Sequence, residues 1–179
     1  MMDCKQALTE AKGDMEQAVV LLRKKGVSVA AKKATRVTSE GAVASYIHAG
    51  GKIGVLVEVN CESDFVARTD DFQNLVKEIG MHIAAASPTY ARREDVPADV
   101  IERERKIYES LAREEGKPEA AWPKIVDGKI NGFYKANPGG ALVEQSFVKD
   151  QKSTVGALVA ELGEGASVRR FARVKIGEE

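Results

Sequence analysis

The chain has 179 residues, 44% of them hydrophobic and 30% charged, a composition typical of a globular protein with a packed core. Its 27 basic and 27 acidic side chains balance, which argues against a protein that works by neutralising phosphate backbones, so we expect no direct nucleic-acid binding. Two cysteines are too few for a disulfide framework and favour a reducing compartment, while the lack of an apolar run of about 20 residues and the charged start of the chain predict neither a membrane span nor a signal peptide.

The first part of the chain predicts a small helical module, residues 1–35, followed by a polar linker at 36–41. Apolar residues recur at helical spacing, and Gly13 ends the first helix. Asp14 is then placed to cap a second helix, with Gln17 completing a capping-box pattern. A third short helix is expected before the linker, because two helices of this size bury too little apolar surface to be stable alone.

The remainder of the chain, residues 42–179, predicts an α+β domain. Two alternating segments, at 42–48 and 52–60, are typical of strands, and the glycine-rich stretch between them suits a hairpin loop. In the second segment the residues expected to face the core are Ile53, Val55, Val57 and Val59. A helix is predicted over 70–86, because its apolar residues recur every three or four positions.

Three more helices and a final strand follow. Helices are predicted over 98–116, 118–137 and 153–162. The closing strand is free to join the hairpin, and the residues expected to share one of its faces are Val168, Ala172, Val174 and Ile176. The sequence therefore predicts a three-helix module followed by an α+β domain with a small antiparallel sheet packed against helices.

The sequence contains no pattern for a nucleotide, cofactor or metal site. No glycine-rich phosphate loop is present, so the chain is not expected to bind GTP itself. The candidate metal ligands are scattered, with no pair at zinc-ligand spacing: Cys4, His48, Cys61 and His82. A Cys61–His48 nucleophile pair, as in a cysteine-dependent hydrolase, is the alternative, although a free cysteine at a strand end is more often an apolar filler. We therefore expect a protein that is not an enzyme and carries no cofactor.

The most informative segment is VEVNCESDFVARTDDF, residues 57–72, where a strand ends and the chain turns before the next helix. Phe65 lies in this turn, outside the regular elements. In one interpretation, which the residues alone favour, Phe65 folds back as a hydrophobic lid on the sheet and Asp64 caps the following turn. In the other, Asp64 and Phe65 form an exposed wedge that a rigid scaffold presents to a partner.

Three motifs together resemble the elongation factor Ts family. The first is Met-Met-Asp-Cys-Lys-x-Ala-Leu with a later Gly-Asp and Leu-Arg-x-x-Gly, over residues 1–26, and it is similar to the family's ubiquitin-associated-like (UBA-like) module. The second is Glu-Val-Asn-Cys-x-x-Asp-Phe-Val-Ala at 58–67, and the third is LVEQSFVKD followed by VRRFARVKIGEE near the end of the chain. Because the three motifs span the chain in the family's order, the resemblance is specific.

The resemblance implies a guanine-nucleotide exchange factor of translation elongation, whose partner is the GTPase elongation factor Tu. In the family an Asp-Phe tip pushes between helices of the nucleotide domain of Tu and disturbs its Mg²⁺ and phosphate contacts. The matched residues are Asp64 and Phe65 at the tip, Val66 and Ala67 shaping it, and Met1 and Met2, which would pack on Tu. The resemblance also implies a bacterial cytoplasmic protein or, in organelles, one of the plastid stroma or mitochondrial matrix.

The chain departs from the family pattern in two places. Some members carry a second α/β lobe and a protruding helical hairpin, whereas this chain resembles the shorter form, with a brief charged segment at 102–115. Short members can pair, so the resemblance also suggests a homodimer. The Pro-Gly-Gly stretch at 138–140 interrupts the family's more compact pattern and leaves the packing of that edge open.

Two other functions compete with nucleotide exchange. The first is a UBA-like interaction module without exchange activity, which leaves the Asp-Phe segment without a role. The second is RNA binding, which has only three basic clusters in its favour, and these are more often helix ends, linkers and exposed strand faces.

Overall fold

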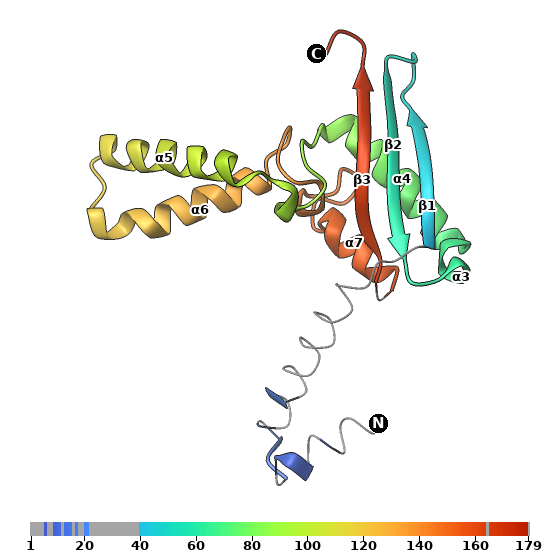
Figure 1. Cartoon of the computed structure of the whole chain (residues 1–179), viewed down its shortest axis with the longest axis horizontal. Helices are drawn as coiled ribbons and strands as arrows, with labels where there is room; N and C mark the ends of the chain where they lie inside the picture. Colours follow the sequence, from blue (N-terminus) through green and yellow to red (C-terminus); the bar gives the residue numbers. More distant parts are fainter. Residues whose placement is uncertain are drawn as a thin grey trace. The chain divides into compact units, whose positions relative to one another are not determined.

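A computed structural model describes residues 40–163 and 165–178, together with residues 6, 9–11, 13–15, 17, 20 and 21. The chain divides into two compact units, Met1–Thr38 and Ser39–Glu179. The elements of the second unit are labelled in Figure 1. Most of the predicted three-helix module and its linker, including Met1 and Met2, lie outside the described residues, so the module stays a prediction.

The described residues of the first unit include the predicted start of its second helix. Gly13 has a left-handed φ of 90°, as expected of a glycine that ends a helix. The Asp14 N–H donates to the carbonyl oxygen of Ala11 at 2.9 Å, and the N–H of Gln17 donates to Asp14 Oδ1 at 3.1 Å. Asp14 is therefore the helix cap that the sequence predicts.

The second unit is built on a three-stranded antiparallel sheet in the order β1-β2-β3. Strand β1 (Glu40–Ile47) and strand β2 (Ile53–Cys61) form the predicted hairpin, and β3 (Ser167–Lys175) pairs with the other edge of β2. The loop between β1 and β2 turns through Gly50 and Gly51, which both have a left-handed backbone. Glycine is suited to these positions because residues with a side chain rarely adopt that conformation.

Helix α4 (Asp70–Ala86) covers the inner face of the sheet, behind the strands in the view of Figure 1. The alternation of β2 places three valines on this face, and the 3.6-residue period of α4 places its apolar stripe against them. The fully buried large apolar side chains of these two elements are Val57, Val59, Phe72, Val76, Ile79 and Ile83. Gly80 lets α4 approach the sheet, since a Cβ there would lie 3.1 Å from the Cβ of Tyr46 on β1.

Strand β3 departs from the predicted alternation. Its register against β2 shifts between Glu58 and Val59, so that Arg170 lies opposite Glu58 while Val168 lies opposite Val59. Arg169 is the extra residue of this β-bulge, and it reverses the pleat. The prediction that Val168 shares a face with Ala172, Val174 and Ile176 is therefore wrong: Val168 and Phe171 pack toward the core, whereas Val174 and Ile176 are exposed.

The middle of the chain forms a helical hairpin that extends away from the sheet in Figure 1. Helix α5 (Ala98–Glu114) and helix α6 (Trp122–Tyr134) pack side by side and carry a second hydrophobic cluster. The buried members of this cluster are Val96, Val126, Ile130, Tyr134 and Ala141. The charged segment at 102–115 is thus part of a 17-residue helix in a hairpin, rather than the brief segment expected from the short form of the family.

Shorter elements connect these parts. Two short α-helices are α3 (Asp64–Ala67), between β2 and α4, and α7 (Val155–Glu161), before β3. Single 3-10 turns are η1 (Arg93–Asp95), η2 (Glu119–Ala121) and η3 (Leu142–Glu144). None of the helices in the described part of the chain combines the length and apolar composition that a membrane span requires.

The Pro-Gly-Gly stretch packs at the base of the helical hairpin. The carbonyl oxygen of Gly140 accepts hydrogen bonds from the N–H groups of Thr89 and Tyr90, each at 3.1 Å. Gly140 has a left-handed φ of 62°, and a Cβ on it would lie 2.6 Å from the carbonyl oxygen of Tyr134. This position accepts only glycine, because a side chain would collide with backbone.

A buried polar network ties α4 to the same region. The N–H of Val148 donates to His82 Nδ1 at 3.2 Å, so His82 Nε2 carries the proton and donates to Gln145 Oε1 at 3.0 Å. Gln145 Nε2 in turn donates to the carbonyl oxygens of Ala136 and Gly139 at 2.7 and 2.6 Å. The network satisfies a neutral imidazole, and burial lowers the pKa of His82 despite the hydrogen bond to Gln145.

This network predicts that the free energy of unfolding falls on acidification. His82 binds a proton in the unfolded chain near its ordinary pKa of 6.5 and in the folded chain only at lower pH, so the unfolded state gains protons first. The contribution is fully present above the unfolded value and falls below it, by up to about 1.4 kcal/mol per pH unit. Denaturant unfolding at about pH 7.5 and about pH 5.5 should show this loss, and His82→Gln should flatten it. An unchanged pH slope in His82→Gln would contradict the assignment.

Candidate functional site

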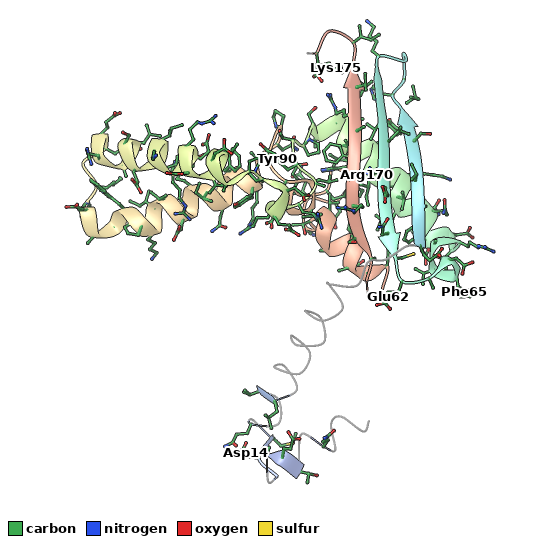
Figure 2. All side chains as sticks on the ribbon, in the orientation of Figure 1. Asp14, Glu62, Phe65, Tyr90, Arg170 and Lys175 are labelled. Atoms are coloured by element: carbon green, nitrogen blue, oxygen red, sulfur yellow. The ribbon has the colours of Figure 1, made fainter. Side chains whose placement is uncertain are left out.

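The Asp-Phe segment lies at the end of the sheet where β2 stops. Cys61 is the last residue of β2, Glu62 and Ser63 form the turn, and α3 follows as a single helical turn before α4. Figure 2 shows Phe65 on α3 and Glu62 in the turn at this end of the second unit. The segment is therefore held at both ends by elements that supply core residues, β2 before it and α4 after it.

The side chains of Asp64 and Phe65 point to solvent. Phe65 is 80% exposed, more than any other large hydrophobic residue in the described part of the chain. Asp64 makes an exposed ion pair with Arg68 at 2.9 Å. The interpretation of Phe65 as a lid on its own sheet is therefore wrong, and the exposed-wedge interpretation matches the geometry.

Ser63, rather than Asp64, caps the turn. Ser63 has the extended backbone of an N-cap residue, and its Oγ accepts a hydrogen bond from the N–H of Val66 at 3.4 Å. Asp64 is the first residue inside the helical turn, where a carboxylate also interacts favourably with the exposed N–H groups. Its carboxylate thus remains at the surface beside the Phe65 ring.

Val66 and Ala67 anchor the turn from below. Val66 is half-buried and packs against the core, and Ala67 is only 6% exposed and belongs to the core itself. The side chain of Ala67 faces the core and cannot reach a second protein. It shapes the tip by fixing the backbone beneath it.

The joint between α3 and α4 is held by polar contacts that the sequence analysis missed. Thr69 caps α4: its Oγ1 accepts from the N–H of Phe72 at 3.3 Å and donates to the carbonyl oxygen of Val66 at 2.8 Å. Gln73 Nε2 donates to the carbonyl oxygen of Ala67 at 2.7 Å. The signal available for Thr69 was a threonine directly before an acidic first turn, which is typical of an N-cap.

The alternative nucleophile pair is not formed. His48 lies in the loop before β2, where its N–H bonds the carbonyl oxygen of Ile53, whereas Cys61 ends the same strand and pairs with Glu40. The two side chains therefore lie at opposite ends of β2. Cys61 is buried, and its thiol donates to the carbonyl oxygen of Ser63 at 3.1 Å, as an apolar filler with a local partner would.

The other candidate ligands do not gather either. His82 is buried in its network with Gln145, and Cys4 lies outside the described residues. Among residues 40–163 and 165–178 and the few described before them, no three His, Cys, Asp or Glu side chains are grouped to hold a metal ion. With no nucleophile pair and no metal cluster among the described residues, the exposed Asp-Phe turn is the candidate functional site.

Comparison with known proteins assigns the family. The profile of the family described as "Elongation factor TS" matches residues 4–178. The chain belongs to the elongation factor Ts family. Its sequence is 61% identical to "Elongation factor Ts" of Geobacter sulfurreducens over 182 aligned residues, which cover 99% of this chain and 83% of that relative. "Elongation factor Ts" of Koribacter versatilis is 59% identical, with 99% of this chain and 82% of the relative covered.

Membership of the elongation factor Ts family places the chain in translation elongation, a step of protein biosynthesis. The exposed Asp64–Phe65 turn lies inside the matched region, in the second of the three motifs that carry the resemblance. The residues that the family motif singles out are therefore the same residues that the structure exposes.

The role of Thr69 predicts a defined stability change. Thr69→Ala removes both hydrogen bonds of the hydroxyl and should lower the free energy of unfolding by about 1 kcal/mol. Thr69→Ser keeps the hydroxyl and should restore most of that loss. Urea unfolding of the three proteins measures the difference, and equal stabilities for the alanine and serine variants would contradict the cap.

Proposed function

We propose that this chain is a non-enzymatic guanine-nucleotide exchange factor that binds elongation factor Tu with GDP and promotes GDP release. The observation that carries the proposal is the 80% exposure of Phe65 beside the carboxylate of Asp64, on a turn fixed to the core, in a member of the elongation factor Ts family. The tip would insert beside the nucleotide site of Tu and disturb the contacts of its Mg²⁺ and phosphates. The relatives named above come from bacteria, and we place this action in the bacterial cytoplasm.

The energy available at the tip suits this role. Burying a phenylalanine side chain contributes about 1.5–3 kcal/mol, while a tenfold weakening of GDP binding needs about 1.4 kcal/mol. Because the ring is already exposed in the free chain, inserting it into a partner breaks no packing of its own core. By linkage, GDP must weaken binding of this chain to Tu by the same factor.

The ion pair between Asp64 and Arg68 is weak enough for Asp64 to bind a group on Tu instead. The pair is exposed on both sides, and exposed pairs of this kind are worth little because water screens them. The carboxylate can therefore leave Arg68 for a group on Tu at small cost. Val66 packs against the core beneath the turn, and we propose that Met1 and Met2 also contact Tu.

Phe65→Ala tests the wedge. The variant should keep the parental free energy of unfolding within about 0.5 kcal/mol, because the ring is a surface side chain. The stimulated rate of GDP release should fall by about ten- to a hundredfold, the equivalent of the lost burial. Stopped-flow release of fluorescent GDP from purified Tu measures the rate, and Phe65→Leu should give an intermediate value.

Val148→Ala is the matched control, because it also truncates an exposed apolar side chain, far from α3 along the chain. It should keep the parental rate. If the Phe65→Ala variant binds Tu and stimulates GDP release as fast as the parent does, Phe65 does not act as a wedge. If the parent itself binds Tu without accelerating release, the chain is an interaction module without exchange activity.

We also propose that two copies of the chain pair through the outer face of the sheet. This face lies opposite α4, and the large apolar side chains exposed on it or beside it are Val43, Ile47, Leu56, Val174 and Ile176. Leu56 lies at its centre, between Ser45 of β1 and Ala172 of β3. A second copy would cover an apolar surface that is costly to leave in water.

Leu56→Glu tests the dimer by placing a charge at the centre of this face. The parent should sediment as a dimer and the variant as a monomer at the same concentration, because an unpaired buried carboxylate is strongly unfavourable. Ala160→Glu, an exposed change on α7, is the control and should leave the dimer intact. A monomeric parent, or a dimeric Leu56→Glu variant, would contradict pairing through this face.

A further inference from the structure

Helix α3 is too short to fix its own direction. It has four residues and is closed by two backbone hydrogen bonds, from Ala67 N–H to Ser63 O at 3.2 Å and from Arg68 N–H to Asp64 O at 3.1 Å. One isolated helical turn is not stable in water, because the entropy of ordering its residues exceeds the gain from so few bonds. The direction of the Phe65 ring must therefore be set by contacts between the turn and the rest of the unit.

The turn packs on β1 and β2 as well as α4, but its directional contacts, the hydrogen bonds, lie mostly within the turn or at its joint with α4. Ser63 Oγ and Thr69 Oγ1 both bond the backbone of Val66, so they move together with the turn. Val66 and Ala67 are anchored by apolar packing, which resists lifting of the turn but is not directional. The Phe65 side chain, being exposed, adds little restraint of its own.

One hydrogen bond reaches α3 from the body of α4. Gln73 lies in the second turn of α4, where its own N–H bonds the carbonyl oxygen of Thr69 at 3.0 Å. Its side chain extends back over six residues, and Nε2 donates to the carbonyl oxygen of Ala67 at 2.7 Å. Ala67 is the last residue of α3, so this carbonyl is one of those that a helix end leaves without an intrahelical partner.

We propose that Gln73 is a positioning residue for Phe65, an inference that rests on the exchange function proposed above. Its side-chain amide holds the end of α3 at a fixed angle to α4 and keeps the ring in the direction in which it enters elongation factor Tu. Gln73 itself does not touch the partner in this account. It raises the fraction of molecules, both free and docked on Tu through the rest of the interface, whose tip is ready to insert.

The expected effect follows from the fraction of molecules that hold the tip in the competent orientation. Loss of one neutral hydrogen bond changes an equilibrium by about fivefold, so the competent orientation would become about fivefold rarer. The remaining interface is unchanged, so the chain still docks on Tu at the same concentration. Because docking through the rest of the interface does not require the competent orientation, the maximal rate of GDP release should fall while the half-saturating concentration stays constant.

Three substitutions separate the hydrogen bond from charge and size. Gln73→Glu keeps the size of the side chain but replaces the donor with a carboxylate, which only accepts. Gln73→Lys restores a donor that can reach the same carbonyl. Asn74→Asp introduces the same charge change at the next position, an exposed residue of α4, and is the matched control.

The experiment measures stimulated GDP release as a function of the concentration of each protein, together with amide hydrogen exchange of the free chain. Gln73→Glu should lower the maximal rate by about fivefold and speed exchange of the Arg68 N–H by a similar factor, with β2 unchanged. Gln73→Lys should restore both values, and Asn74→Asp should match the parent in both.

Several results would overturn the positioning role. These are a parental maximal rate in Gln73→Glu, an equal loss in Asn74→Asp, a change confined to the half-saturating concentration, or no recovery in Gln73→Lys. If the parent does not accelerate GDP release, the proposed function fails and the role in exchange fails with it. Amide exchange still decides in that case whether Gln73 holds α3, so the two failures are distinguishable.

Discussion

The packing of α4 on the inner face of the sheet is the interaction on which the rest of the second unit depends. Val57 and Val59 of β2 meet Phe72 and Val76 of α4 with almost no exposed surface. Since α3 is the chain's direct passage from β2 to α4, this packing brings both ends of the turn to fixed positions. The structure can then leave a large aromatic ring in water, because the ring's own burial is not needed for stability.

Polar contacts fix the orientation of segments that apolar packing alone does not hold. Around α3 they cap the turn and the start of α4, and deeper in the unit the network of His82 and Gln145 joins α4 to the base of the helical hairpin. Arg93 adds a second link at this base, where it bonds Glu144 and lies over the ring of Tyr134 at 4.3 Å. The two hydrophobic clusters are thus connected by directional contacts rather than by one continuous core.

Much of this fold could be predicted from the residues. The alternation in β2, the period of α4 and the cap at Asp14 predicted structure that is present, because each is a local pattern with a fixed geometric meaning. The bulge at Arg169 could not be predicted, since an extra residue in a strand depends on its partner strand. The exposure of Phe65 could not be derived from periodicity either, because a turn of four residues is too short to define a face; only the family motif favoured it.

The bulge also decides how β3 tolerates changes in length. Val168 precedes Arg169 and Phe171 follows it, yet both side chains face the core, and Val174 further along the strand faces outward. Removing Arg169 would restore a regular pleat with Val168 and Phe171 still facing the core, whereas inserting or deleting one residue between Phe171 and Lys175 would turn the residues after it over to the other face. This strand is therefore expected to tolerate loss of Arg169 far better than a change of length elsewhere along it.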